Sequence, residues 1–307
     1  KATNMYKVVH EMASMWFGNF ISPKNWQDAW ITEALAAYAE GMWQEYKRGL
    51  TVYQIILDEK EYFDGGKLFL DKAEDYSKER LNKKGMYAIH MLRGIMSDVY
   101  FFETLRAIVA GKRLKNPEDK YLLSTKRFQQ ICEYYASENI DQDYSYFFEQ
   151  WIKGEFFPVY QVSYTVNANQ LQLNVKQKVR TSLPNFFTMP IQVQIKMQDG
   201  RLRKQTLVCN KAEQNFEIEL EGALSSLEFD PSNWILKDLE YLKEISNDKF
   251  DVDAVVFSSS KNRRKLDVRF NVPKKQDISI EIIRIADGMT VKEDKTIELK
   301  TLSGRQG

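Results

Sequence analysis

A histidine and a glutamate stand side by side near the start of the chain, at His10 and Glu11. In the pattern His-Glu-x-x-His, a helix places two histidines on one face, where they bind one zinc ion, and the glutamate acts as a general base. The second histidine position is occupied here by Ser14. A neutral hydroxyl is a poor ligand for zinc, which binds imidazole, thiolate and carboxylate groups. The residues therefore predict a zinc site that lacks one ligand.

An aromatic and glycine framework around this pair makes a chance match implausible. It resembles the metal-binding segment of the membrane alanyl aminopeptidase (aminopeptidase N) family of gluzincin zinc metallopeptidases. The framework residues are Trp16-Phe17-Gly18-Asn19, Pro23, Trp26, Trp30, Glu33, Ala36 and Tyr38. The resemblance implies that His10 and Glu33 are ancestral zinc ligands. It also implies that Glu11 is the ancestral general base and that Ser14 replaces the second histidine.

A second segment of the same resemblance runs over residues 84–93. The resemblance implies a tyrosine three residues before Gly85, whose hydroxyl stabilises the oxyanion of the tetrahedral intermediate, a role worth a few kcal/mol of barrier. That position is Asn82 here. An amide can donate a hydrogen bond, but its side chain is shorter than that of tyrosine. Tyr76 and Tyr87 lie nearby, and neither has the family's spacing to Gly85.

Loss of the metal would leave Glu33 as a carboxylate that faces Glu11 in a cleft. Such a pair raises the pKa of one partner or requires a nearby cation. The tryptophans, in contrast, are expected in the core, because aromatic residues at helical spacing usually pack there.

Composition excludes several classes of partner. The chain has 307 residues, with 44 Lys and Arg against 43 Asp and Glu. This length is sufficient for two or three domains. Because the charges balance, the chain has no excess of positive charge that would indicate binding to nucleic acid or to an anionic membrane. Cys132 and Cys209 give no disulfide framework and no cysteine metal site. No apolar run is long enough for a transmembrane segment.

Residues 1–157 have a helical pattern and are expected to form the helical lobe of a gluzincin catalytic domain. Apolar residues over 29–46 recur at intervals of about 3.6 residues, as on one face of a helix, and 87–109 is similarly amphipathic. A helix is also predicted over 8–16. Breaks between helices are expected at Gly18, Gly65-Gly66, Gly85, Gly111 and Asn116-Pro117.

Residues 158–237 alternate between apolar and polar side chains, which predicts half-buried antiparallel strands. The clearest segments are 161–166, 171–175, 191–195 and 216–220. Short strands separated by turn residues are typical of a small β-sandwich. Residues 229–237 resemble the end of the family's β-sandwich domain.

Residues 238–249 are predicted to form a charged, partly helical connector, and 250–307 a C-terminal β domain. Strands are expected over 252–257, 265–272, 278–285 and 296–302. The domain is weakly similar to the C-terminal sorting domains of the type nine secretion system of Bacteroidetes, which implies a secreted or cell-surface bacterial protein. An immunoglobulin-like accessory domain is the open alternative.

The predicted fold class is therefore multidomain α + β, with a thermolysin-like helical lobe, a β-sandwich and a second small immunoglobulin-like β domain. The family's upstream Gly-x-Met-Glu-Asn segment does not occur in the chain. The sequence is therefore expected to be the C-terminal portion of a longer protein, whose N-terminal domain precedes Lys1.

Three functions are compatible with these residues. The favoured one is a catalytically degenerate metallopeptidase-like module that binds peptides or proteins or acts as a scaffold. The second is an active zinc-dependent aminopeptidase that hydrolyses N-terminal residues from peptides, and the third is a structural β-sandwich carrier. Ser14 and Asn82 favour the first over the second. Zinc, the cofactor of the family, is expected to be absent or weakly bound, because two protein ligands fall short of three.

Overall fold

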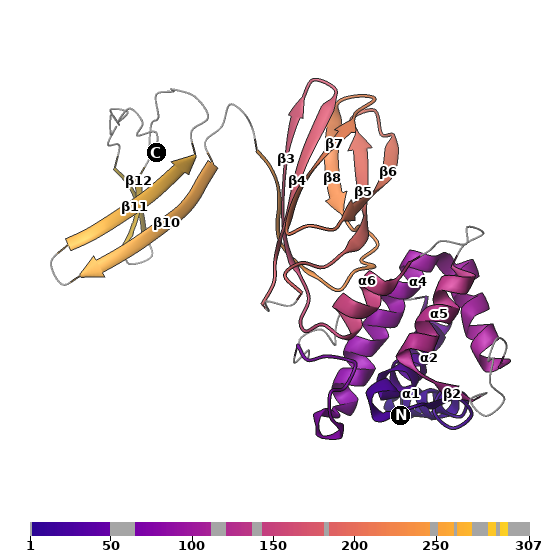
Figure 1. Ribbon diagram of the computed structural model, residues 1–307. Helices are drawn as coiled ribbons and strands as arrows, with labels where there is room; N and C mark the ends of the chain where they lie inside the picture. The colour runs from indigo at the N-terminus through magenta and orange to yellow at the C-terminus, as the bar shows by residue number, and fades with distance from the viewer. Residues whose placement is uncertain are drawn as a thin grey trace. The chain divides into compact units, whose positions relative to one another are not determined.

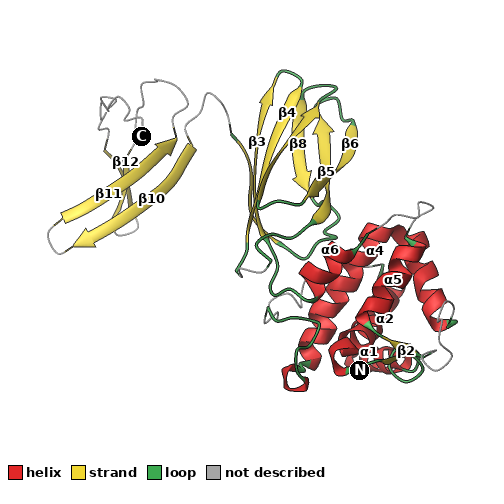
Figure 2. Cartoon of the chain, viewed as in Figure 1, coloured by secondary structure: helices red, strands yellow, loops and turns green. Residues whose placement is uncertain are grey.

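The structure is a computed structural model that describes residues 2–49, 65–111, 121–136, 143–180, 184–245, 251–260, 263–271, 282–286 and 289–293. The chain divides into two compact units, Lys1–Lys243 and Glu244–Gly307 (Figure 1). Helices occupy the first part of the first unit and strands the second part (Figure 2). The predicted α + β class is confirmed.

The helical part begins with α1 and ends just before the first long strand. Its helices are α1 (Ala2–Ser14), α2 (Ala29–Arg48), α4 (Lys78–Val109), α5 (Thr125–Tyr135) and α6 (Ser145–Phe147). Short turns of other helix types are η1 (Trp26–Asp28), η3 (Ala73–Asp75) and η5 (Phe148–Ile152). The two-residue strands β1 (Ser22–Pro23) and β2 (Leu122–Leu123) pair in parallel. Helix α1 ends at Ser14, short of the predicted 8–16.

Helix α2 is the buried centre of this part. The Asp28 carboxylate, just before its first residue, accepts hydrogen bonds from the Thr125 backbone N–H at 2.7 Å and from its hydroxyl at 2.8 Å. The Trp30 indole donates to the same hydroxyl at 3.0 Å. Gly49, with φ 66°, ends the helix in the left-handed conformation that glycine adopts without strain. These contacts tie the start of α2 to α5.

Helix α4 corrects the prediction that the chain breaks at Gly85. Gly85 lies inside the helix, where it packs against Ala34 of α2. A Cβ atom at Gly85 would come within 2.7 Å of the Ala34 Cβ, a distance that real Cβ atoms do not reach. Glycine is therefore used here for close helix packing and not to end a helix.

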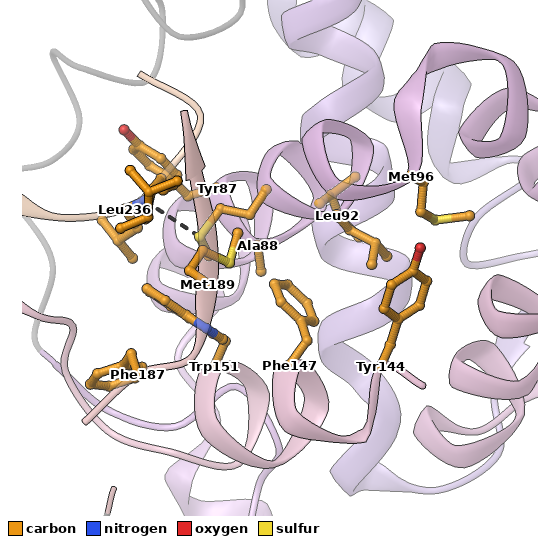
Figure 3. Close-up of a cluster of buried hydrophobic side chains, with 14 of the residues drawn as sticks. Tyr87, Ala88, Leu92, Met96, Tyr144, Phe147, Trp151, Phe187, Met189 and Leu236 are labelled. Carbon is orange, nitrogen blue, oxygen red and sulfur yellow. Dashed lines mark hydrogen bonds between the residues drawn. The ribbon is translucent and has the colours of Figure 1, made fainter. Parts of the chain in front are cut away.

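The helices and the sheets of the first unit share one buried core (Figure 3). The Trp151 ring lies 4.6 Å from the Phe187 ring and 6.5 Å from the Phe147 ring, measured between centroids. The Leu236 backbone N–H donates to the Met91 sulfur at 3.4 Å. The segment around Leu236 is thereby fixed to α4.

Two sheets follow, in which most neighbouring strands pair antiparallel. The first contains β3 (Val159–Asn167), β4 (Gln170–Lys178), β7 (Glu213–Glu219) and β9 (Asp238–Glu244) in the order β7-β4-β3-β9. The second contains β5 (Met189–Met197), β6 (Leu202–Cys209) and β8 (Leu224–Phe229) in the order β6-β5-β8. The predicted strands 161–166, 171–175 and 191–195 lie within β3, β4 and β5, and 216–220 overlaps β7.

Strand β9 corrects the prediction of a partly helical connector over 238–249. Residues 238–244 form an edge strand beside β3. The Glu240 carboxylate accepts hydrogen bonds from Gln161 and Lys178, both at 2.9 Å. Charged side chains are typical of edge strands, since they face solvent and discourage pairing with other chains. The charged residues that predicted a connector are therefore those of an edge strand.

The second unit contains two described hairpins. Strands β10 (Asp251–Ser260) and β11 (Arg263–Asn271) pair antiparallel, as do β12 (Ile282–Ala286) and β13 (Met289–Glu293). The predicted strands 252–257 and 265–272 match β10 and β11 up to residue 271. The part of 278–285 before residue 282, and all of 296–302, lie outside the described residues.

Two further predictions concern the whole chain. Cys132 and Cys209 are both buried and free, in agreement with the absence of a disulfide framework. Among the helices of the described ranges, none has both the length and the apolar character needed to cross a membrane.

Candidate functional site

The His10 imidazole is the buried group of the site. Helix α1 carries it, and the residue is 9% exposed. Its Nδ1 lies 3.7 Å from the Glu40 carboxylate of α2. Burial lowers the pKa of His10, while the Glu33 and Glu11 carboxylates act to raise it and Lys78 acts to lower it. The net shift is downward, so the ring is neutral at neutral pH.

Ser14 uses its hydroxyl within its own helix. Its Oγ donates to the His10 backbone carbonyl at 3.0 Å, one turn earlier. Such back-bonding is a common way for serine to satisfy its hydroxyl in a helix. The position that would hold the second imidazole therefore carries a neutral hydroxyl, which already donates its proton in a hydrogen bond to the backbone.

Glu33 receives a hydrogen bond from a tyrosine. The hydroxyl of Tyr76, which follows η3, donates to Glu33 Oε1 at 3.2 Å. Burial raises the pKa of Tyr76, and the Glu33 carboxylate raises it further. The phenol therefore keeps its proton at neutral pH and remains a donor to this partly buried carboxylate.

The structure places Asn82 in the early part of α4. Its Oδ1 is buried and has no hydrogen-bond partner among the described residues. Tyr76, and not Asn82, reaches the Glu33 carboxylate. The predicted residues His10, Glu11 and Glu33 thus form one electrostatic group, whereas Asn82 is not hydrogen-bonded to any of them.

Sequence reasoning did not find Glu40 or Lys78. Glu40 follows Glu33 by two helical turns, so helical periodicity places both on the same face of α2, a signal that could have found it. Lys78 begins α4, and its action on His10 depends on how the chain folds back after η3. No local pattern predicts that approach.

Trp26 corrects the expectation that the tryptophans are core residues. It is 65% exposed, whereas Trp30 is fully buried. The Trp26 ring meets the Tyr76 ring edge to face, with centroids 6.2 Å apart and planes at 82°. A cavity of about 590 Å³ lies beside it, lined by Pro23, Lys24, Trp26, Ala29, Asp71 and Lys72. The aromatic pair thus stands at the edge of a space that a side chain can enter.

His90, the second histidine, belongs to the packing of the first unit. Its ring is 4% exposed and stacks on Trp234, with centroids 4.4 Å apart. Its Nδ1 is 3.2 Å from the Tyr38 hydroxyl. Burial lowers the pKa of His90 to about 3, so the ring packs in its neutral form at neutral pH.

Comparison with known proteins supports the resemblance carried by the metal-binding segment. The profile of the Peptidase family M1 domain matches residues 1–65. Aminopeptidase N of Lactococcus lactis subsp. lactis is 26% identical over 192 residues, which cover 55% of this chain and 20% of that protein. Aminopeptidase N of Streptomyces lividans is 43% identical over 37 residues, or 12% of this chain and 4% of that protein. The chain thus spans about a fifth or less of these relatives.

The fold has a counterpart among solved structures. Aminopeptidase A of Legionella pneumophila, in complex with aspartic acid, superposes with a TM-score of 0.62 at 16% identity. The match covers 77% of this chain and 27% of that one. These matches support an aminopeptidase N-like gluzincin family for this chain.

A catalytic zinc ion, as in the matched family, would need ligands that the side chains of this site do not supply. The described residues contain no group of three His, Cys, Asp or Glu side chains arranged to hold a metal. His10 offers one nitrogen, Glu33 offers a carboxylate that already accepts from Tyr76, and the Ser14 hydroxyl is bonded to the backbone. Catalytic zinc sites use three protein ligands. The donor set therefore does not fit a catalytic zinc ion.

Proposed function

We propose that this chain is a catalytically degenerate aminopeptidase-family module that binds peptides or proteins without hydrolysing them. The observation that carries the proposal is the contact at Ser14, whose hydroxyl donates to the His10 carbonyl. The site keeps the His10 imidazole and the Glu33 carboxylate of the ancestral ligand set. The third ligand is replaced by the neutral Ser14 hydroxyl, which is hydrogen-bonded to the backbone.

Hydrolysis requires an activated water. Bulk water has a pKa of about 15.7, and a bound metal ion lowers it toward neutrality. Glu11 can accept a proton, but without a metal it acts on a water that is almost never ionised at neutral pH. Asn82 stands where the family has its tyrosine, so stabilisation of the oxyanion is also reduced. Both deficits act on the same transition state.

Retention of binding is supported by the surroundings of the site. The curated relatives are aminopeptidases, which act on peptides. Trp26 and Tyr76 are exposed aromatic residues beside a cavity, and exposed aromatic residues are frequent anchors of binding surfaces. We also infer that the two sheets of the first unit form a β-sandwich and that the second unit is a separate β domain, an arrangement suited to display or scaffolding.

Two measurements on the same preparation test the proposal. Isothermal titration with short peptides is expected to show binding, and an aminoacyl arylamide assay is expected to show no cleavage above background, with or without added zinc. Efficient cleavage that a chelator abolishes would instead support an active aminopeptidase. Failure to bind any peptide would favour the structural carrier.

A further inference from the structure

We propose that Glu33, Tyr76 and Trp26 bind an organic ammonium group, such as a lysine side chain or a peptide amino terminus, where the family holds its metal. This inference rests on the proposed peptide-binding function and names the chemistry of the group that is bound.

The first step is the state of Glu33. Its carboxylate is partly buried, yet its one hydrogen bond within the described part of the chain comes from the neutral Tyr76 hydroxyl at Oε1. A partly desolvated carboxylate is stabilised by a cation and by further hydrogen-bond donors. The Oε2 atom makes no hydrogen bond to a described residue and can accept one from an ammonium group.

The second step is the local charge. The Glu11 and Glu33 carboxylates both act on His10, and Glu40 lies 3.7 Å from its Nδ1. Lys78 opposes them, but it is an exposed side chain at the start of α4. Among the described residues, three carboxylates and one ammonium group act at this place. The arrangement attracts a cation, although it lacks the ligands that a zinc ion needs.

The third step is the aromatic pair, which makes the site more than a group of acidic residues. Trp26 and Tyr76 are 65% and 38% exposed and meet edge to face. Aromatic faces attract ammonium ions, tryptophan most strongly, because the cation interacts electrostatically with the quadrupole of the ring. Since the Tyr76 hydroxyl is bonded to Glu33, the tyrosine joins the aromatic surface to the carboxylate. This combination suits an alkylammonium group better than a hydrated metal ion.

The fourth step is access. The cavity of about 590 Å³ beside Trp26 gives room for the remainder of a bound peptide. Lys24 and Lys72 line that cavity and favour polar or acidic groups there, away from the ammonium position. The expected ligand is therefore a peptide with an ammonium group near Glu33 and no second cation close to it.

The test uses the full chain and three short peptides with the same backbone. One carries a lysine side chain with a blocked amino terminus, one a free amino terminus with no lysine, and one neither charge. Titration is expected to give at least about tenfold tighter binding for one or both cationic peptides than for the neutral one. The first two peptides distinguish the source of the ammonium group.

Variants locate the site. Glu33→Gln and Trp26→Leu are expected to remove the preference for the cationic peptide. Their matched controls, Glu74→Gln and Trp16→Leu, change another exposed carboxylate and another exposed tryptophan and are expected to retain it. Circular dichroism and thermal unfolding confirm that each variant is folded.

Equal binding of the neutral and cationic peptides would overturn the ammonium site while leaving the peptide-binding function intact. A charge preference that survives Glu33→Gln and Trp26→Leu would also overturn it, because the cation would then bind elsewhere. Absence of binding to all three peptides would overturn both the site and the proposed function.

Discussion

The Tyr76 hydroxyl donates a hydrogen bond to the Glu33 carboxylate at 3.2 Å. This bond links the segment after η3 to helix α2. In the aminopeptidase N-like family that the comparisons support, the carboxylate at this position is expected to face a metal ion. Here a neutral phenol occupies one of its oxygen atoms. Most of the chemistry expected of the site follows from this contact and from the bond that Ser14 makes to its own helix.

The first prediction concerns metal content. The unmutated chain is expected to hold well under one zinc ion per molecule after dialysis, because His10 and Glu33 supply two ligands where three are needed. Addition of EDTA is then expected to leave the unfolding temperature unchanged. Elemental analysis and a thermal melt measure both. One tightly held zinc ion per chain, with a third protein ligand, would contradict the prediction.

The second prediction concerns restoration of the ligand. Ser14→His supplies a second imidazole one turn after His10 and is expected to recover zinc binding, since each lost ligand costs affinity heavily. Adding Tyr76→Phe removes the hydrogen bond to Glu33 and is expected to strengthen zinc binding by about tenfold. Competition with a zinc chelator measures both affinities. Tyr76→Phe alone is the control and is expected to bind no stoichiometric zinc.

The third prediction concerns packing at Gly85. Gly85→Ala brings a methyl group within 2.7 Å of the Ala34 Cβ, so α2 and α4 must move apart. The free energy of unfolding is expected to fall by about 1–3 kcal/mol, as for other overpacked sites. Urea unfolding measures it. Gly222→Ala is the matched control, because its new methyl group meets the flexible end of Arg201 at 3.3 Å and the Asp199 carboxylate at 3.9 Å, an ordinary contact distance. An equal loss there would contradict this account.

The fourth prediction concerns pH. Burial lowers the pKa of His90 to about 3 in the folded chain, against about 6.5 when unfolded. The unfolded state therefore binds the proton more readily between these values. The neutral ring contributes its full stability above about pH 6.5, and that contribution is lost as the pH falls toward 3, by on the order of 4–5 kcal/mol in total.

Urea unfolding at pH 7, 6 and 5 measures this loss. In His90→Phe, whose ring can still stack on Trp234, the decline between pH 7 and 5 is expected to be shallower. His10 is the other histidine of the chain and remains in the variant, so its contribution is common to both proteins. Identical slopes in the two proteins would show that His90 is not responsible.

The sequence predicts those parts of the site that lie within one helix or on neighbouring turns. His10, Glu11 and Ser14 share α1 by spacing alone, and the alternation over 161–195 predicts strands because each residue faces core or solvent in turn. Contacts between distant segments lack such a signal. The bond from Tyr76 to Glu33 depends on the path of the chain around η3, which no local periodicity describes.

Two other misses have the same origin. Trp26 has the residue type of a core position, but it lies in η1, where the turn leaves its ring exposed. Residues 238–244 have the charge content of a solvated connector, and only the free edge of β3 makes them a strand. In both cases the residue type alone allows more than one conformation or degree of burial, and contacts with distant segments select one of them.

The last prediction concerns turnover. The unmutated chain is not expected to hydrolyse aminoacyl substrates above background, because the attacking water is not activated and the oxyanion lacks the tyrosine hydroxyl. These deficits act on one transition state, so repair of either alone is expected to give little activity. Ser14→His should therefore bind zinc with almost no turnover, whereas Ser14→His with Asn82→Tyr is expected to give more turnover. Cleavage of an aminoacyl arylamide, followed with and without chelator, measures each variant. Efficient, chelator-sensitive cleavage by the unmutated chain would refute the degenerate site and establish an active aminopeptidase in its place.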